Sequence, residues 1–233
     1  GVDVVEKPEE VSRSEGDVHP QGNPHIWLDP LNGITIAENI KKGLCRIAPE
    51  HADAFQKNLE AFKRKIYEHL YGKELVEMLK GGEVLAKLDR AGRLIEVLKK
   101  KKYKGKPLIE YLGGWHKEML PYRGRKIVTH HRSWSYFVRR FGLRVVCELE
   151  PKPGITPSPR HLVRVVRRVK AEGVSVILLE PCYSTKAANF VASRTGAKVV
   201  VASASVGGQK EATDYFALFD NIINRLKAAW EGE

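Results

Sequence analysis

Several features are scarce or missing in this 233-residue sequence, and each absence removes a class of protein. The three cysteines, Cys45, Cys147 and Cys182, show no CxxC spacing and are odd in number, which argues against a disulfide framework and a zinc knuckle. No apolar run reaches the roughly 18 residues of a membrane-spanning helix. The opening residues, GVDVVEKPEE, are polar and acidic, unlike a signal peptide.

The motifs of common hydrolases and nucleotide-binding enzymes are also missing. The sequence contains no HExxH, no GxSxG nucleophile elbow and no P-loop. It therefore matches no hydrolase template, and an enzyme would have to use a site that these motifs do not describe.

Acidic residues are fewer than basic ones, with 28 Asp and Glu against 40 Lys and Arg, which gives a net charge of +12. The densest basic run is KKKKYKGK at 99–106, and it has little of the aromatic interleaving that single-strand binders use. We favour a solvated surface. Nucleic-acid binding remains a third interpretation, and it predicts binding that weakens steeply with salt.

What the chain does contain is the composition of a folded protein, with 42% apolar and 29% charged residues. From residue 126 onward, short apolar runs alternate with helical patterns, which predicts an α/β fold with a parallel sheet covered on both faces. The expected strands are 126–131, 144–149, 174–180 and 197–203, and the expected helices are 133–142, 158–173, 184–196 and 213–230.

The sequence pattern of residues 1–125 predicts mostly helices, preceded by one short strand. Residues 2–5, VDVV, have the composition of a strand. Asp29 and Pro30 suit the N-cap and first position of a helix that continues to about residue 48, with an apolar stripe that includes Ile40 and Ile47. Pro49 then opens a second helix to about residue 70. Residues 72–125 predict a mostly helical insertion with loops, of unknown purpose.

Histidines and carboxylates follow the ends of the expected strands. His130 and His131 come after the first strand, Glu148 and Glu150 after the second, and Glu180 after the third. In open parallel sheets, ligands bind beyond these carboxyl ends. Imidazole and carboxylate groups are ligands for Zn²⁺ and, with more oxygen, for Mn²⁺. The sequence thus indicates a metal site, provided that His25 in NPHIWLDP reaches the same edge.

Three stretches resemble the metal-binding receptors that supply zinc or manganese to bacterial ABC importers. They are NPHIWLDP with the following PEHADAFQKNLEAFKRKI, then VTHHRSWSYFVRRFGL, and finally PSPRHLVRVVRRVKAEGVSVILLEP with TGAKVVV. The resemblance covers nearly the whole chain except 72–125. It implies two α/β lobes with parallel sheets, joined by a long rigid helix, with one metal held between the lobes.

Carried over by motif, the resemblance implies that His25 and His131 are metal ligands. It divides the chain into the remainder of an N-terminal lobe (1–48), the linker helix with the insertion (49–125) and a C-terminal α/β lobe (126–233). The family supplies a further histidine from a segment before the first residue here, so we expect much of the N-terminal lobe to be missing.

The resemblance leaves the remaining ligands open. The aspartate that the family places after the last strand falls near Ala204. Glu180, His19, a water molecule or nothing replaces it. We expect His130, Trp27, Trp134 and Glu150 to support the site from behind or to pack at the lobe interface, and we expect four other histidines to be solvated: His51, His69, His116 and His161.

We therefore expect a binding protein without enzymatic activity. It would capture Zn²⁺, or alternatively Mn²⁺, and deliver it to an ABC-type membrane permease. The resemblance places it in the periplasm or on the outer face of the cytoplasmic membrane, exported or lipid-anchored. We expect a monomer that binds no nucleic acid. The alternative is a metal-dependent hydrolase that uses a His/Glu site to activate water.

Overall fold

A computed structural model describes residues 1–8, 16 and 19–232 of the chain. The chain divides into two compact units. One is helical and comprises residues 1–2 and 27–121, and the other is an α/β unit formed by residues 3–26 and 122–233. The segment that carries His25 therefore folds with the C-terminal half of the chain, although 100 residues separate it from the first strand of the sheet.

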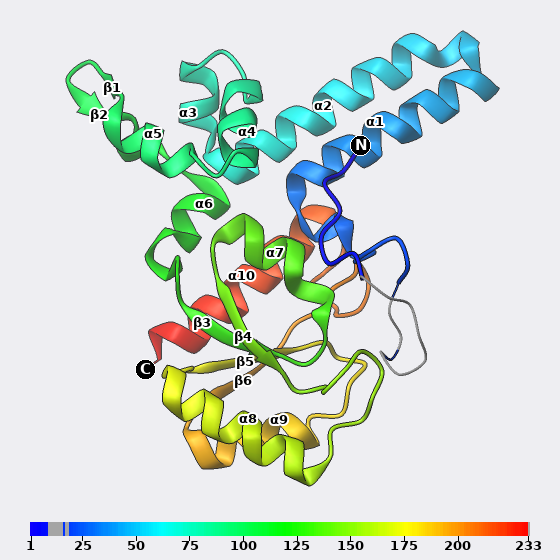
Figure 1. Cartoon of the computed structure of the whole chain (residues 1–233). Helices are drawn as coiled ribbons and strands as arrows, with labels where there is room; N and C mark the ends of the chain where they lie inside the picture. Colours follow the sequence, from blue (N-terminus) through cyan, green and yellow to red (C-terminus); the bar gives the residue numbers. More distant parts are fainter. Residues whose placement is uncertain (9–15, 17–18, 233) are drawn as a thin grey trace. The chain divides into compact units, whose positions relative to one another are not determined.

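The α/β unit contains a four-stranded parallel sheet in the order β4-β3-β5-β6 (Figure 1). Its strands are β3 (Lys126–Thr129), β4 (Arg144–Glu148), β5 (Val176–Leu179) and β6 (Lys198–Val201). Its helices are α7 (Ser135–Phe141), α8 (Pro159–Glu172), α9 (Lys186–Thr195) and α10 (Tyr215–Glu231). The expected alternation of strands and helices is confirmed, because each crossover in this parallel sheet is a helix.

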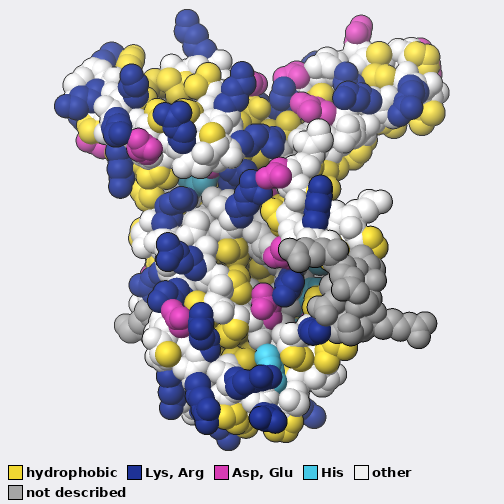
Figure 2. All heavy atoms as spheres, viewed as in Figure 1, with side chains coloured by type: hydrophobic (Ala, Val, Ile, Leu, Met, Phe, Trp, Pro, Cys, Tyr) yellow, Lys and Arg dark blue, Asp and Glu magenta, His cyan; other side chains and the backbone are white. Residues whose placement is uncertain are grey.

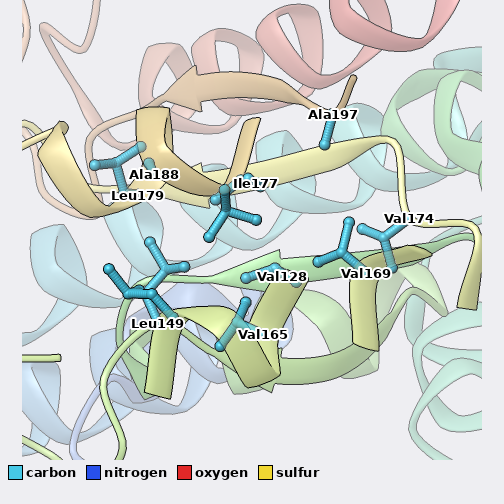
Figure 3. Packing of buried hydrophobic residues seen from close by; sticks show 11 residues of the cluster. Val128, Leu149, Val165, Val169, Val174, Ile177, Leu179, Ala188 and Ala197 are labelled. Atoms are coloured by element: carbon cyan, nitrogen blue, oxygen red, sulfur yellow. The ribbon is translucent and has the colours of Figure 1, made fainter. Parts of the chain in front are cut away.

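Helices cover both faces of the sheet, with α8 and α9 on one side and α7 and α10 on the other (Figure 1). Every residue of the inner strand β5 is buried, as expected for a strand covered on both faces. Figure 3 shows the core beneath α8 and α9, where Val128 and Ile177 of the sheet face Val165 and Val169 of α8. This packing holds the strand ends in place.

The strand order places a topological switch point between β3 and β5. The chain leaves β3 for β4 on one side of the sheet and returns to β5 on the other. The crevice beyond such a point is the usual ligand position in an open α/β sheet. The residues that follow the two strands are His130 and His131 after β3, and Glu180 after β5.

The helical unit begins with two long helices, α1 (Pro30–Ile47) and α2 (Ala52–Tyr71). Asp29 caps α1, since its side chain accepts a hydrogen bond from the Leu31 backbone N–H, and the predicted start and end of this helix are confirmed. The prediction of a buried apolar stripe fails toward the C-terminal end of α1, where Ile40 and Ile47 are 56% and 80% exposed.

The insertion is mostly helical, as predicted. It contains α3 (Lys73–Met78), α4 (Glu83–Arg90), α5 (Leu94–Lys100) and α6 (Gly114–Met119). The strands β1 (Lys102–Tyr103) and β2 (Lys106–Pro107) form a hairpin that the sequence did not predict. Strands of two residues are too short to show an alternating pattern.

Two further expectations were wrong. Residues 2–5 form no strand, and Val5 instead makes single hydrogen bonds to the Asn23 backbone and the Tyr136 hydroxyl. His116 is not solvated: it is 2% exposed, and its Nε2 lies 2.7 Å from Asp89 Oδ2. Its ring stacks on Tyr71, whose hydroxyl donates to the same Asp89 oxygen.

Candidate metal centre

Asn23 holds His25 by two hydrogen bonds. Its Oδ1 accepts the backbone N–H of His25 at 3.0 Å and lies 2.9 Å from the ring Nδ1. Because an amide oxygen can only accept, this contact assigns the ring proton to Nδ1 and the lone pair to Nε2. Metal-ligating histidines are commonly oriented by such a contact to an oxygen acceptor.

Asn23 is in turn fixed to the segment that follows β3. Its Nδ2 donates to the Arg132 carbonyl at 2.7 Å and to Glu6 at 2.9 Å, while the Tyr136 hydroxyl donates to the Asn23 carbonyl. These bonds tie the loop before α1 to the beginning of α7. They are the physical reason that His25 lies near the sheet edge.

Glu150 holds His131 in a similar way. The Nδ1 of His131 lies 2.7 Å from Glu150 Oε2, and the backbone N–H of Gly154 donates to the same oxygen. Glu150 is buried, and its other oxygen lies 3.6 Å from His130 Nε2. A carboxylate on Nδ1 places the proton there and leaves the lone pair on Nε2.

The two rings face each other edge to face, with centroids 6.0 Å apart and an interplanar angle of 71°. Two imidazoles on one tetrahedral zinc, with Zn–N of about 2.0–2.1 Å, have centroids about 5 Å apart. The centroid separation in the structure is therefore about 1 Å longer than the separation in such a site.

The electrostatic environment keeps His25 neutral. Burial, followed by the proximity of His131 and His19, lowers the pKa of His25 to about 4. A neutral imidazole is the form that binds a metal ion. The ring therefore needs no proton release to become a ligand at neutral pH.

His19 lies beside these two histidines. A cavity of about 190 Å³ is lined by His19, His25 and His131, together with Glu6 and Arg132. His131 and Glu150 also line a second cavity of about 690 Å³, whose walls include Tyr183 and Phe190. The structure thus gathers three of the four expected ligands around one cavity.

Glu180 is placed differently. It is 5% exposed and does not line the 190 Å³ cavity, and neither carboxylate oxygen has a hydrogen-bond partner among the described residues. Burial raises the pKa of Glu180, while the nearby Ser133, His131 and Trp134 act in the opposite direction. Ser133 and Trp134 lie close enough to influence this carboxyl without reaching hydrogen-bonding geometry.

Of the four residues expected to support the site, three belong to the α/β unit and one belongs to the helical unit. His130 and Trp134 are buried in the α/β unit, where His130 stacks on Tyr183 with ring centroids 4.1 Å apart and burial lowers its pKa. Glu150 contacts both histidines of the VTHH motif. Trp27 belongs to the helical unit and is half-buried there.

Within the described part of the chain, no three His, Cys, Asp or Glu side chains already stand in the arrangement of a complete metal site. Ala204 is buried in the loop after β6, where 202–210 carries no carboxylate. Asn23 opens the NPHIWLDP motif, but its role in holding His25 was not predicted, because the contact of its side chain with the ring depends on how the loop folds.

The sequence matches the family model described as "ZnuA: Zinc-uptake complex component A periplasmic" over residues 1–71 and 107–229. The high-affinity zinc uptake system protein ZnuA of Brucella abortus is 27% identical over 204 residues, which cover 87% of this chain and 48% of that protein. The zinc-binding protein AdcA of Streptococcus pyogenes is 25% identical over 229 residues, which cover 97% of this chain and 36% of that protein. The chain therefore spans about half the length of these relatives, or less.

Solved structures agree on the fold. The laminin-binding adhesin Lmb from Streptococcus agalactiae, in a mutant form, superposes with a TM-score of 0.58 at 25% identity, covering 90% of this chain and 66% of that one. A crystal structure of ZnuA gives a TM-score of 0.59 at 22% identity, covering 90% and 60%. The predicted fold class is confirmed by this likeness.

Proposed function

Because the chain belongs to the ZnuA family of periplasmic zinc-uptake components, we propose that it binds a divalent transition metal ion and passes it to the permease of an ABC importer. Zinc is the favoured ion, and manganese is the alternative. The observation that carries the proposal is the facing pair His25 and His131, whose Nδ1 atoms are each held by an oxygen acceptor.

Two imidazole nitrogens favour zinc over harder ions, since Mn²⁺ prefers a larger share of oxygen ligands. We assign the Nε2 atoms of His25 and His131 as the first two ligands and His19 as the third. Water can complete a four-coordinate ion. Glu180 is the carboxylate that would join if its side chain turned toward the ion, and a nearby cation would favour its ionised form.

The supporting roles follow from the contacts. Asn23 and Glu150 orient the two ligand rings, and His130 and Trp134 form part of the buried wall behind them. We place the domain boundaries as the family resemblance implies, with 126–233 as the C-terminal lobe, 49–125 as linker helix and insertion, and 1–48 as part of the N-terminal lobe. Trp27 belongs to that N-terminal part.

The family description is periplasmic, and we propose that this chain acts outside the cytoplasmic membrane as a monomeric receptor without enzymatic activity. Among the described residues, no helix combines the length and the apolar character needed to cross a bilayer. The match to a family of zinc-uptake components favours a receptor over the hydrolase alternative.

Calorimetric titration of the metal-free protein with Zn²⁺ and with Mn²⁺ tests the proposal. We expect one zinc site, with affinity reduced at least about tenfold in His25→Ala and in His131→Ala. His51→Ala is the matched control, because that ring is exposed on the helical unit and should leave binding unchanged. Equal zinc affinity in all four proteins would overturn the assignment.

A further inference from the structure

The hairpin of the helical unit displays a dense cluster of lysines that the proposed metal site does not use. Six lysines stand among the eight residues 99–106, and every residue of this run is exposed. We call this segment the lysine hairpin. It lies inside 72–106, the internal stretch that the family match leaves out.

The hairpin presents its charges on an ordered frame. Strands β1 and β2 pair Tyr103 with Lys106 around a two-residue turn, in which Lys104 and Gly105 have φ values of 47° and 82°. Positive φ at both positions is typical of the type I′ turn of tight hairpins. The Leu108 N–H donates to the Lys101 carbonyl, and buried Leu94 and Leu98 anchor the preceding α5.

These charges are poorly compensated within the chain. Lys100 pairs with Glu96 at 2.7 Å, whereas Lys101, Lys102, Lys104 and Lys106 make no ion pair with any described residue. Like charges at this density repel one another, and no burial offsets that cost. Figure 2 shows Lys and Arg side chains crowding the side of the helical unit where Figure 1 places β1 and β2.

We propose that the lysine hairpin docks on an anionic phospholipid surface. Lysines act as compact point charges, which suit a diffuse layer of headgroup phosphates better than bidentate recognition. Tyr103 stands among them, 42% exposed, with the Lys104 ammonium 5.4 Å from its ring centroid. An exposed tyrosine flanked by lysines suits the boundary between water and lipid headgroups.

A nucleic-acid partner is less well served by this surface. Single-strand binding uses several aromatic platforms for base stacking, and the run 99–106 contains one aromatic residue. Strands of two residues also offer no groove that would follow a phosphate backbone. A flat anionic layer needs neither feature, because it requires only a protruding basic tip.

Vesicle co-sedimentation of the metal-free protein tests the proposal, so that its outcome is independent of zinc binding. We expect binding to phosphatidylcholine vesicles that contain phosphatidylglycerol, little binding to phosphatidylcholine alone, and release between about 0.1 M and about 0.5 M salt. The triple variant Lys101→Gln, Lys102→Gln and Lys106→Gln should lose on the order of 10- to 100-fold in partitioning.

The matched control removes the same charge from α8 through Arg164→Gln, Arg167→Gln and Lys170→Gln, all of which replace exposed residues. This control should partition as the parent protein does. Equal loss in the two triple variants would show that net charge alone drives binding and would overturn the proposal. A competition experiment gives a second test, in which a duplex DNA oligonucleotide or phosphatidylglycerol micelles are added to the vesicle-bound protein. If DNA releases the protein at a lower concentration than the micelles do, and this release depends on the same three lysines, the proposal is overturned.

Discussion

Asn23 Oδ1 accepts two hydrogen bonds from His25, one from the backbone and one from the ring. The short loop thereby fixes both the position of the histidine and the nitrogen that carries its proton. A ligand oriented before the metal arrives loses less conformational freedom on binding. Asn23 is thus a positioning residue for the proposed zinc site.

Replacing Asn23 with alanine should weaken zinc binding about 10- to 100-fold, because the His25 ring loses its orienting acceptor. Calorimetry measures the affinity, and a thermal melt shows whether the fold is retained. Asn189→Ala on α9 removes an exposed asparagine whose side chain bonds to Thr185 at the start of the same helix, and we expect it to behave as the parent protein. Unchanged affinity in Asn23→Ala would exclude a positioning role.

Replacing Glu150 with glutamine should also weaken zinc binding, by about tenfold or more. The neutral amide keeps the size of the side chain but removes the charge that supports the His131 ring at 2.7 Å. The control is Glu148→Gln, which changes a neighbouring carboxylate that pairs loosely with Arg132 at 3.8 Å. Similar affinities for both variants would argue that the Glu150 charge has no influence on the site.

The metal-free protein should lose stability as the pH falls from about 6.5 toward 4. The pKa of His25 is lowered to about 4 by burial, then by His131 and His19, so over this interval the unfolded chain takes up a proton that the folded chain does not. The free energy of unfolding therefore decreases with falling pH and levels off below 4 for this group.

This histidine should contribute roughly 1 kcal/mol to the decrease, a figure reduced from the full shift because the ring is only partly buried. Urea unfolding at several pH values measures the slope. His25→Asn should show a shallower slope over the same interval, since asparagine does not titrate. An identical slope in parent and variant would contradict the lowered pKa.

Replacing His116 with alanine should destabilise the helical unit by about 2–4 kcal/mol. The substitution leaves the buried Asp89 carboxylate without its 2.7 Å imidazole partner and opens a cavity beside Tyr71. Denaturant unfolding followed by circular dichroism gives the difference. The control is His51→Ala at an exposed position, whose free energy of unfolding should stay within about 0.5 kcal/mol of the parent value. An equally small change in His116→Ala would show that the buried contact with Asp89 contributes little to stability.

The sequence alone determined the features that depend on neighbours along the chain. Asp29 and Ser158 accept hydrogen bonds from the first turns of their helices, and Gly142 and Gly173 end helices in the left-handed region that favours glycine. The alternation of apolar strands with helices was sufficient for the α/β class. His25 and His131 were identified by their motifs, and their role as ligands stays a prediction.

Only the tertiary structure decided which distant groups meet. Asn23 bonds to Arg132 across 109 positions, Glu150 reaches His131 across 19, and Asp89 reaches His116 across 27. No local pattern encodes such contacts, because a polar side chain has the same propensity whether water or a buried partner satisfies it. For the same reason His116 was expected in solvent, and the contacts of Asn23 and Glu150 with the two ligand histidines were not predicted.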